Sequence, residues 1–472
     1  MARPDPDPAR PTRPARRDPA VLLVVAVVLG LAVVASLSAG RVYRSLDDPT
    51  ADLPARPGFV SAPDPVLRTE SGLEPNSTDE APGAPKPEIR AIQVGPTAVT
   101  LLRGGRVERA VPLARPLTTP AEIAAAVADE DWMRMSTPTE VVVDAALIMT
   151  PGTTLTVAPP LQRMVLQARP GVFLGGDDAV LRFSGVEVEA SDRAVPRQGE
   201  VGPGSRPFVL AAGGRMEIDS STFRYLGRDW NDSYGVSWTK GASGYATGST
   251  FERGFMGIFA ATAIDVRFER NTFRDNALYG INAHELSAGL VIADSVAEGN
   301  GRDGILLSDH VTGSEVRGNT SRDNGLNAIM LDDGSDRNTV TGNVAEGNGG
   351  DGIVVARSSG NTVTGNTVRD NRVAVGVYGG EPGSNAVTGN VLADNGLAAQ
   401  GAAVDGNEVL SNGDHWRPGA LGVVWLLAGL ATWLLVRGTR AARRRRDEAV
   451  ELARASRTAP SAVEPARPAV SR

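Results

Sequence analysis

Apolar and polar residues alternate in six segments of the central part of the chain, and these segments align position by position. Such alternation is typical of β-strands, because successive side chains of a strand point to opposite faces. The segments are YGVSWTK (234–240), MGIFAAT (256–262), YGINAHE (279–285), DGILLSD (303–309), NAIMLDD (327–333) and DGIVVAR (351–357). The predicted inward stacks are Val236, Ile258, Ile281, Ile305, Ile329 and Ile353, and then Trp238, Ala260, Ala283, Leu307, Leu331 and Val355.

A repeat with a nearly constant period carries these segments. Asn319, Asn343, Asn366 and Asn390 follow one another at steps of 24, 23 and 24 residues, by subtraction of their numbers. A fixed period of this length predicts a solenoid. Three short strands per period favour an all-β fold, a right-handed parallel β-helix, and the pattern of leucine-rich repeats is missing. A second asparagine column contains Asn276, Asn300, Asn324, Asn348, Asn371 and Asn395. We expect the amides of both columns to bond between coils and to be structural.

The remaining positions of each segment are predicted to point outward. His284 then projects from an exposed sheet face, and Asp332 lies two coils away, at roughly 10 Å for a coil spacing of about 4.8 Å. The outward columns are Ser237, Phe259, Asn282, Leu306, Met330 and Val354, and then Thr239, Ala261, His284, Ser308, Asp332 and Ala356. The last positions, where each strand turns, hold Lys240, Thr262, Glu285, Asp309, Asp333 and Arg357.

His284 is one of three histidines and is surrounded by acids in this register. Imidazole suits general acid–base chemistry near neutral pH. The alternatives are a solvated surface histidine, or a metal site made by His284, His310 and a carboxylate. A long sheet face suits a linear polysaccharide, and the outward column of Phe259, Leu306 and Met330 either stacks against sugars or is covered by a loop.

Two apolar segments flank the repeat, at 19–40 and at 418–436. Each has a length near that of a membrane span, and arginines lie before the first and after the second, so both termini are predicted to face the cytoplasm. A cleaved signal peptide is the alternative for the first segment. The predicted order is a cytoplasmic tail (1–18), a transmembrane helix (19–40), a disordered linker (41–90), a cap of strands and helix (91–137), the β-helix (138–413), a second transmembrane helix (418–436) and a basic cytoplasmic tail (437–472).

Within the cap, residues 119–135 begin with Thr119 followed by Glu122, which is the pattern of a capping box. Their periodicity predicts a helix over this range.

Composition excludes several classes of function. The 472 residues carry a formal net charge of −7, which gives no electrostatic footprint for nucleic acid. The chain has no cysteine, which excludes disulfides, zinc–thiolate sites and cysteine nucleophiles.

The run from SYGVSWTK through RNTFRDNALYGINAHE to DGIVVARSSGNTVTGN, within about residues 205–395, resembles the alginate (poly-mannuronate) C5-epimerases. YGINAHE is similar to the family's Tyr-Gly-Ile-Asp-Pro-His-Asp. The resemblance implies a β-helix that binds carbohydrate, with His284 as the base that removes the C5 proton of a uronate. Tyr279 corresponds to the family's tyrosine, Asn282 to its first aspartate, Glu285 to its last, and Asp332 to an aspartate of the following coils. The candidate substrate-binding residues around these are Ser308, Asp309, Asp333, Lys240 and Phe259.

The sequence departs from the family pattern at the arginine that faces the substrate carboxylate. That position is Asp309 here, or His310 if the register slips by one, and Arg302 is the nearest arginine in the sequence. A different substrate, a carboxylate bridged by a metal such as calcium, or lost catalysis would each account for this. No other cofactor is implied.

Three functions stay open on this scaffold. The first is a membrane-anchored, extracytoplasmic enzyme that modifies a polysaccharide such as a polyuronate, with an isomerase activity like that of an epimerase. The second is a glycoside hydrolase or lyase like the polygalacturonases, with carboxyl pairs among Glu285, Asp309, Asp332 and Asp333. The third is a non-catalytic binding or scaffold protein, like the β-helix accessory proteins of copper-site assembly. The fold alone does not choose among them.

Overall fold

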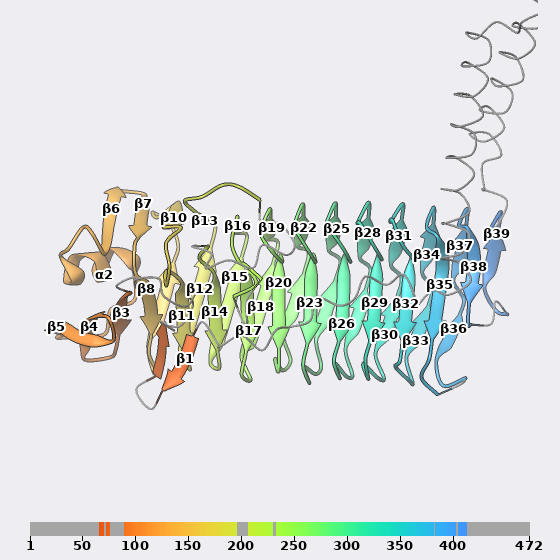
Figure 1. Cartoon of the computed structure of the whole chain (residues 1–472), viewed down its shortest axis with the longest axis horizontal. Coiled ribbons are helices and arrows are strands. Elements are labelled where there is room, and N and C mark those ends of the chain that lie inside the picture. The colour runs from red at the N-terminus through yellow and green to blue at the C-terminus, as the bar shows by residue number, and fades with distance from the viewer. Residues whose placement is uncertain are drawn as a thin grey trace, which may run out of the picture. The chain divides into compact units, whose positions relative to one another are not determined.

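The computed structural model describes residues 66–69, 72–75, 89–195, 206–229, 233–381, 383–402 and 405–412. These residues form a parallel β-helix of stacked coils, which confirms the predicted all-β solenoid (Figure 1). Each coil adds one strand to each of three long sheets, and neighbouring strands along the stack pair in parallel.

The 14-stranded sheet carries the six aligned segments, and its order runs from the C-terminal end of the stack to the cap. Its strands are β38 (Leu397–Gln400), β35 (Val373–Tyr378), β32 (Ile353–Ala356), β29 (Ile329–Asp332), β26 (Ile305–Ser308), β23 (Ile281–His284), β20 (Ile258–Ala261), β17 (Val236–Thr239), β14 (Val209–Ala212), β11 (Leu174–Asp177), β8 (Ala146–Met149), β3 (Arg90–Val94), β4 (Ala98–Arg103) and β5 (Arg106–Pro112).

The other two sheets complete each coil. The 13-stranded sheet contains β39 (Glu408–Leu410), β37 (Val391–Ala393), β34 (Thr367–Arg369), β31 (Val344–Glu346), β28 (Thr320–Arg322), β25 (Val296–Glu298), β22 (Thr272–Arg274), β19 (Thr250–Glu252), β16 (Thr222–Arg224), β13 (Glu187–Ala190), β10 (Arg163–Leu166), β7 (Glu140–Val143) and β6 (Met133–Thr137). The 10-stranded sheet contains β36 (Ala386–Thr388), β33 (Thr362–Thr364), β30 (Thr339–Thr341), β27 (Glu315–Arg317), β24 (Val291–Ala293), β21 (Arg267–Glu269), β18 (Ser243–Thr247), β15 (Arg215–Asp219), β12 (Val180–Ser184) and β9 (Thr154–Val157). A separate hairpin pairs β1 (Val66–Thr69) with β2 (Gly72–Pro75).

The N-terminal end of the stack is covered by antiparallel strands and one helix. β3, β4 and β5 pair in antiparallel fashion, as do β6 and β7. Helix α2 (Pro120–Val127) begins with the predicted capping box, in which Thr119 and Glu122 bond reciprocally. The predicted helical range of 119–135 is too long, because Ala128 adopts a left-handed conformation that ends the helix, and β6 follows.

The interior of the coils is filled by a single large apolar cluster. Both predicted inward stacks belong to it, and they extend from Val236 to Ile353 and from Trp238 to Val355. These side chains are buried because every second residue of each strand points into the barrel.

The asparagine columns form the predicted ladders along the stack. Asn300 donates its side-chain amide to Oδ1 of Asn324 at 2.9 Å, and Asn324 donates to Oδ1 of Asn348 at 3.0 Å. The other column does the same, with Asn343 donating to Asn366 at 2.9 Å. Each buried amide is therefore hydrogen-bonded to the next coil, and the ladder is structural as predicted.

Charges of opposite sign alternate along one outer column of the 13-stranded sheet. Glutamate and arginine exchange places from coil to coil, so that a slip by one coil would bring like charges together. In order, the column is Glu189, Arg224, Glu252, Arg274, Glu298, Arg322, Glu346 and Arg369. Ion pairs along it include Arg274 with Glu252 and Arg369 with Glu346.

No helix within the described residues is long and apolar enough to cross a membrane. Both predicted spans, 19–40 and 418–436, lie outside the described residues, as do the predicted cytoplasmic tails.

Candidate functional site

The predicted register of the outward face is confirmed strand by strand. β20 and β23 pair so that Phe259 lies opposite Asn282 and Ala261 lies opposite His284. β26 and β29 pair with Ser308 opposite Asp332. The structure therefore brings His284 and Asp332 to the same face of the 14-stranded sheet, as the alternation indicated.

The outward apolar column is buried, so of the two alternatives left open for it the structure favours a covered column over one that is open to sugars. Phe259, Leu306 and Met330 are only 4%, 6% and 6% exposed. They belong to an outer apolar cluster that is separate from the interior of the coils. This cluster contains Tyr234, Phe255, Met256, Phe259, Ala261, Leu278, Tyr279, Leu306, Met330, Val354 and Ala356. Alternation fixes the side to which a residue points, but it carries no information on how deeply that side is buried.

His284 ends β23 and is half-buried, so it is neither a core residue nor freely solvated. Its ring lies 5.8 Å from the ring of Phe259, centroid to centroid. The chain turns immediately after it, since Glu285 and Leu286 both adopt left-handed conformations, with φ of 46° and 56°. Ser287 donates its hydroxyl to the His284 carbonyl at 2.8 Å and braces this turn. The strand therefore stops with the imidazole at the edge of the outer apolar cluster.

Asn282 lies two residues before His284 on the same face and is completely buried. Its neighbours in the column are Phe259 on one coil and Leu306 on the next. Neither its amide nitrogen nor its amide oxygen makes a hydrogen bond in the part of the chain that the structure describes. An amide in this condition costs free energy, so it calls for an explanation.

The predicted acids divide into one buried, paired carboxylate and a group at the turns. Asp332 is buried and accepts a hydrogen bond from Arg357 at 2.6 Å, so its charge is compensated. Ser308 is buried next to it in the column. At the turns, Lys240 and Glu285 are exposed and Asp309 and Asp333 are partly exposed.

Asp309 forms a hydrogen bond with His310, the second histidine of the described residues. Its Oδ1 lies 2.8 Å from Nδ1 of His310. This hydrogen bond, together with the negative charges of Asp309, Asp333 and Asp336, raises the pKa of His310. Asp309 therefore supplies no cation at the position where the resemblance implies an arginine.

A polar network that the alternation did not indicate lies mostly just before the strands of this sheet, and Tyr378 joins it from the end of β35. Asn327 donates to Oδ1 of Asp303 at 2.7 Å, and its own Oδ1 accepts from the backbone N–H of Asp351 at 2.9 Å. Arg372 binds both oxygens of Asp351 at 2.8 and 3.0 Å, and the hydroxyl of Tyr378 donates to the same carboxylate at 2.8 Å. These five residues and Arg302 are called the edge network below.

Asp303 is a buried acid of the edge network whose pKa is raised. It is 1% exposed, and its Oδ2 has no hydrogen-bond partner in the described structure. Burial raises the pKa of Asp303 to about 6, although the positive charge of Arg302 and the hydrogen bonds from Asn327 oppose the shift.

Arg302 is the nearest arginine in the sequence, at the start of its coil, and the structure places it beside Tyr279. Its guanidinium lies 5.6 Å from the ring centroid of Tyr279, and the residue is 8% exposed. Nε and one Nη of this guanidinium are buried without a hydrogen-bond partner among the described residues. A buried cation with unused donors next to Tyr279 is a candidate for binding an anionic group.

The described residues contain no group of three His, Cys, Asp or Glu side chains that could hold a metal ion. The alternative of a metal site built on His284 and His310 therefore finds no support.

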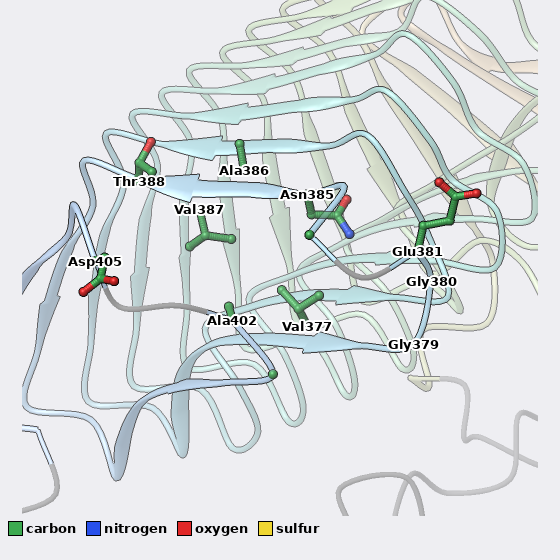
Figure 2. A pocket seen from close by; sticks show the side chains of 12 residues that line it. Val377, Gly379, Gly380, Glu381, Asn385, Ala386, Val387, Thr388, Ala402 and Asp405 are labelled. Atoms are coloured by element: carbon green, nitrogen blue, oxygen red, sulfur yellow. The ribbon is translucent and has the colours of Figure 1, made fainter.

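A cavity of about 550 Å³ lies at the C-terminal end of the stack, far along the coils from His284. Figure 2 shows Val377, Val387 and Ala402 beside it. Glu381 and Asp405 are its titratable lining residues. The cavity contains none of the predicted site residues.

Known proteins match the central coils of this chain. The family described as "Periplasmic copper-binding protein (NosD)" matches residues 217–409, which is less than half of the chain. The mannuronan C5-epimerase of Pseudomonas aeruginosa is 30% identical over 188 residues, which is 37% of this chain and 35% of that protein. The mannuronan C5-epimerase AlgG of Azotobacter vinelandii is 31% identical over 199 residues, which is 39% of this chain and 38% of that protein. The chain thus spans less than two fifths of the length of these curated relatives.

Solved structures confirm the fold. The crystal structure of the periplasmic alginate epimerase AlgG superposes with a TM-score of 0.53 at 22% identity, covering 62% of this chain and 82% of that one. At this identity the likeness shows the architecture alone. The chain is a parallel β-helix protein whose central coils resemble those of the mannuronan C5-epimerases.

Proposed function

We propose that this β-helix acts outside the cytoplasm on a polysaccharide that contains uronate, and that it inverts C5 of a uronate residue with His284 as the base. The observation that carries the proposal is the position of His284. Of the two histidines in the described residues, His284 ends a strand of the 14-stranded sheet, on the same face as Asn282 and Asp332. His310 lies at a turn and binds Asp309.

The chemistry is the removal of a weakly acidic proton from carbon and its return on the opposite face. The imidazole of His284 takes the C5 proton, and the electron pair left on C5 is delocalised into the adjacent carboxylate. A second acid, for which Tyr279 is the candidate, delivers a proton to the other face of C5. Such a reaction also requires positive charge or hydrogen-bond donors at the substrate carboxylate.

Arg302 is the candidate for that cation. Its guanidinium is held against Tyr279 and has buried donors that no described residue uses. Arg357 is a weaker candidate because Asp332 already occupies it. In this proposal the arginine comes from the start of the β26 coil, whereas the family resemblance implies one at its turn.

The remaining predicted residues line the approach to the site. Phe259 supports the imidazole ring, and Ser308 lies on the following coil. Glu285, Asp309, Asp333 and Lys240 flank it at the turns, where their mixed charges would contact parts of the polymer outside the reacting sugar.

The test is hydrogen exchange at C5. The full-length protein is incubated with poly-mannuronate, poly-guluronate, poly-galacturonate and poly-glucuronate in deuterated water, and C5 deuterium is followed by NMR. We expect the wild-type protein to exchange C5 hydrogen on at least one polymer. His284→Ala should lose about 100-fold or more of this exchange rate, whereas His310→Ala, which removes the other described histidine, should keep the wild-type rate. Exchange that is absent from every polymer, or unchanged in His284→Ala, contradicts the proposal.

A non-catalytic binding protein is the second candidate. It is favoured by Asp309, which stands where the resemblance implies an arginine and is engaged with His310. A hydrolase finds less support, because Asp332 is held in an ion pair with Arg357. Binding of an oligosaccharide without C5 exchange would select the second candidate.

The two apolar segments complete the proposal. We place residues 19–40 and 418–436 in the membrane, with the β-helix outside the cytoplasm and both termini inside. The relatives described as periplasmic support the location of the coils. Protease digestion of intact cells that removes the β-helix but spares tags on both termini is the expected result, and digestion of either tag contradicts it.

A further inference from the structure

Asn282 is a buried polar residue whose side chain makes no hydrogen bond within the described fold. It is 0% exposed, lies between Phe259 and Leu306 in the outward column, and makes no hydrogen bond through either amide atom in the described structure. A buried amide normally satisfies both atoms, as the asparagine ladders of the same coils do. The side-chain amide of Asn282 therefore leaves one donor group and one acceptor unsatisfied within the outer apolar cluster.

Asn327 shows that an amide on this side of the coils can be fully satisfied. It donates to Asp303 at 2.7 Å and accepts from the backbone of Asp351 at 2.9 Å. It is also buried, at 3% exposure. The unused amide at position 282 is therefore a local feature and not a general property of this sheet edge.

The chemistry of the amide restricts the group that could satisfy it. A carboxamide has an oxygen that accepts and an N–H₂ group that donates. A carboxylate could bond only to the N–H₂ group and would leave the oxygen unsatisfied. A hydroxyl can donate to the oxygen of one amide and accept from its nitrogen, or two neighbouring hydroxyls can share these roles.

The position of Asn282 ties it to the reacting sugar. Asn282 and His284 are two residues apart on one face, which corresponds to about 6.6 Å along a strand. That distance is comparable with the width of one pyranose ring. Because Asn282 is 0% exposed, a saccharide reaches it only when side chains of the outer apolar cluster move aside. A sugar whose C5 faced His284 would then place a ring hydroxyl, its own or that of the adjoining sugar, at Asn282.

We propose that Asn282 is a specificity-determining residue that hydrogen-bonds an uncharged hydroxyl of the bound saccharide at or next to the residue facing His284. The inference rests on the polysaccharide substrate of the proposed function, but not on the proposed reaction. The inference adds to that function the group of the sugar that Asn282 binds, which is a hydroxyl and not a second carboxylate. Substrates acylated at this hydroxyl would be excluded.

The first test measures stability without any ligand. Asn282→Val removes the unused polar atoms and suits a strand, so we expect the melting temperature to rise by about 2–4 °C. Asn327→Val is the matched control, and its melting temperature is expected to fall because it breaks satisfied hydrogen bonds. Asn282→Ala is a second variant whose smaller side chain cannot clash with its neighbours if valine proves too bulky. A fall in melting temperature for both Asn282 variants overturns the inference.

The second test measures binding, with a mannuronate hexamer and the same hexamer O-acetylated as probes. Loss of two hydrogen bonds in Asn282→Val is expected to weaken binding of the free hexamer about tenfold. The wild-type protein should bind the acetylated probe at least that much more weakly. Equal binding of the two hexamers, binding by Asn282→Val that matches wild type, or no binding by wild type overturns the inference.

The outcomes separate this inference from the proposed reaction. Binding that depends on Asn282, without C5 exchange, removes the reaction and keeps the inference. C5 exchange that depends on His284 but proceeds equally in Asn282→Val keeps the reaction and removes the inference.

Discussion

The buried asparagines of the ladders and the buried Asn282 lie on the same coils and differ in every contact that their amides make. In the ladder, Asn324 accepts two hydrogen bonds from Asn300 and donates to Asn348, so its polar atoms are satisfied by neighbouring coils. On the outward face of the 14-stranded sheet, Asn282 is as deeply buried and has no such bond among the described residues. The difference teaches that residue type and burial alone do not separate structure from function. Hydrogen-bond satisfaction does.

The same contrast holds for charged residues. The alternating column of the 13-stranded sheet pairs glutamates with arginines from coil to coil. Near the proposed site, Arg302 and Asp303 are buried and each keeps an atom without a partner in the described structure. The β23 and β26 coils thus keep hydrogen-bonding capacity that no described residue uses.

The largest expected effect on stability comes from the ladder. Asn324→Val would orphan the backbone N–H of Asn300 and one of its side-chain donors, and would remove the side-chain donor of Asn324 to Asn348. Because each orphaned buried group costs about 1–3 kcal/mol, we expect a loss on the order of 4 kcal/mol in the free energy of unfolding. Denaturant unfolding of this variant beside Asn282→Val checks the comparison. Equal changes in the free energy of unfolding for Asn324→Val and Asn282→Val would contradict the difference between the ladder and Asn282.

A smaller effect is expected from Asp303 as the pH changes. Its pKa is about 6 in the folded protein because of burial, against an ordinary value near 3.8 in the unfolded chain. The folded state therefore holds this proton more tightly, and the group costs stability as the pH rises from about 4 to about 6. Linkage puts this cost at roughly 3 kcal/mol above that window. The fall in unfolding free energy between pH 4 and pH 7 should be smaller in Asp303→Asn than in wild type. Identical falls would show that Asp303 titrates normally.

The smallest effect concerns His310. The hydrogen bond to Asp309 raises its pKa, so Asp309→Asn should lower it. Any stability from this pair is present below the pKa of the unfolded histidine and is lost as the pH rises through the folded value. Because the residue is exposed, the effect is expected in an NMR titration of the ring protons and not in the melting temperature. A pKa that is unchanged in Asp309→Asn would exclude the pair in solution.

The sequence was sufficient to predict the β-helix, the inward stacks, the asparagine ladders and the register of Asn282, His284 and Asp332. Each of these follows from a period, either two along a strand or about 24 along the chain, and a period is a property of the sequence. The capping box of Thr119 and Glu122 is equally local, and the structure contains it.

Other parts of the site could not be predicted, for identifiable reasons. The burial of Phe259, Leu306 and Met330 depends on depth, which alternation does not encode. The edge network lies mostly before the strands, so Asp303 and Asn327 fall outside the alternating positions that were aligned into faces. The column of first positions in the six segments contained the signal, since Asp303, Asn327 and Asp351 stand there in succession.

The measurement that tests the central claim most directly is C5 deuterium incorporation by His284→Ala and by Asn324→Val, side by side at a temperature at which both are folded. We expect His284→Ala to lose exchange while keeping the wild-type melting temperature, and Asn324→Val to keep exchange while its melting temperature falls. Exchange that survives in His284→Ala, or that disappears equally in both variants, would contradict the separation of a functional face from a structural wall.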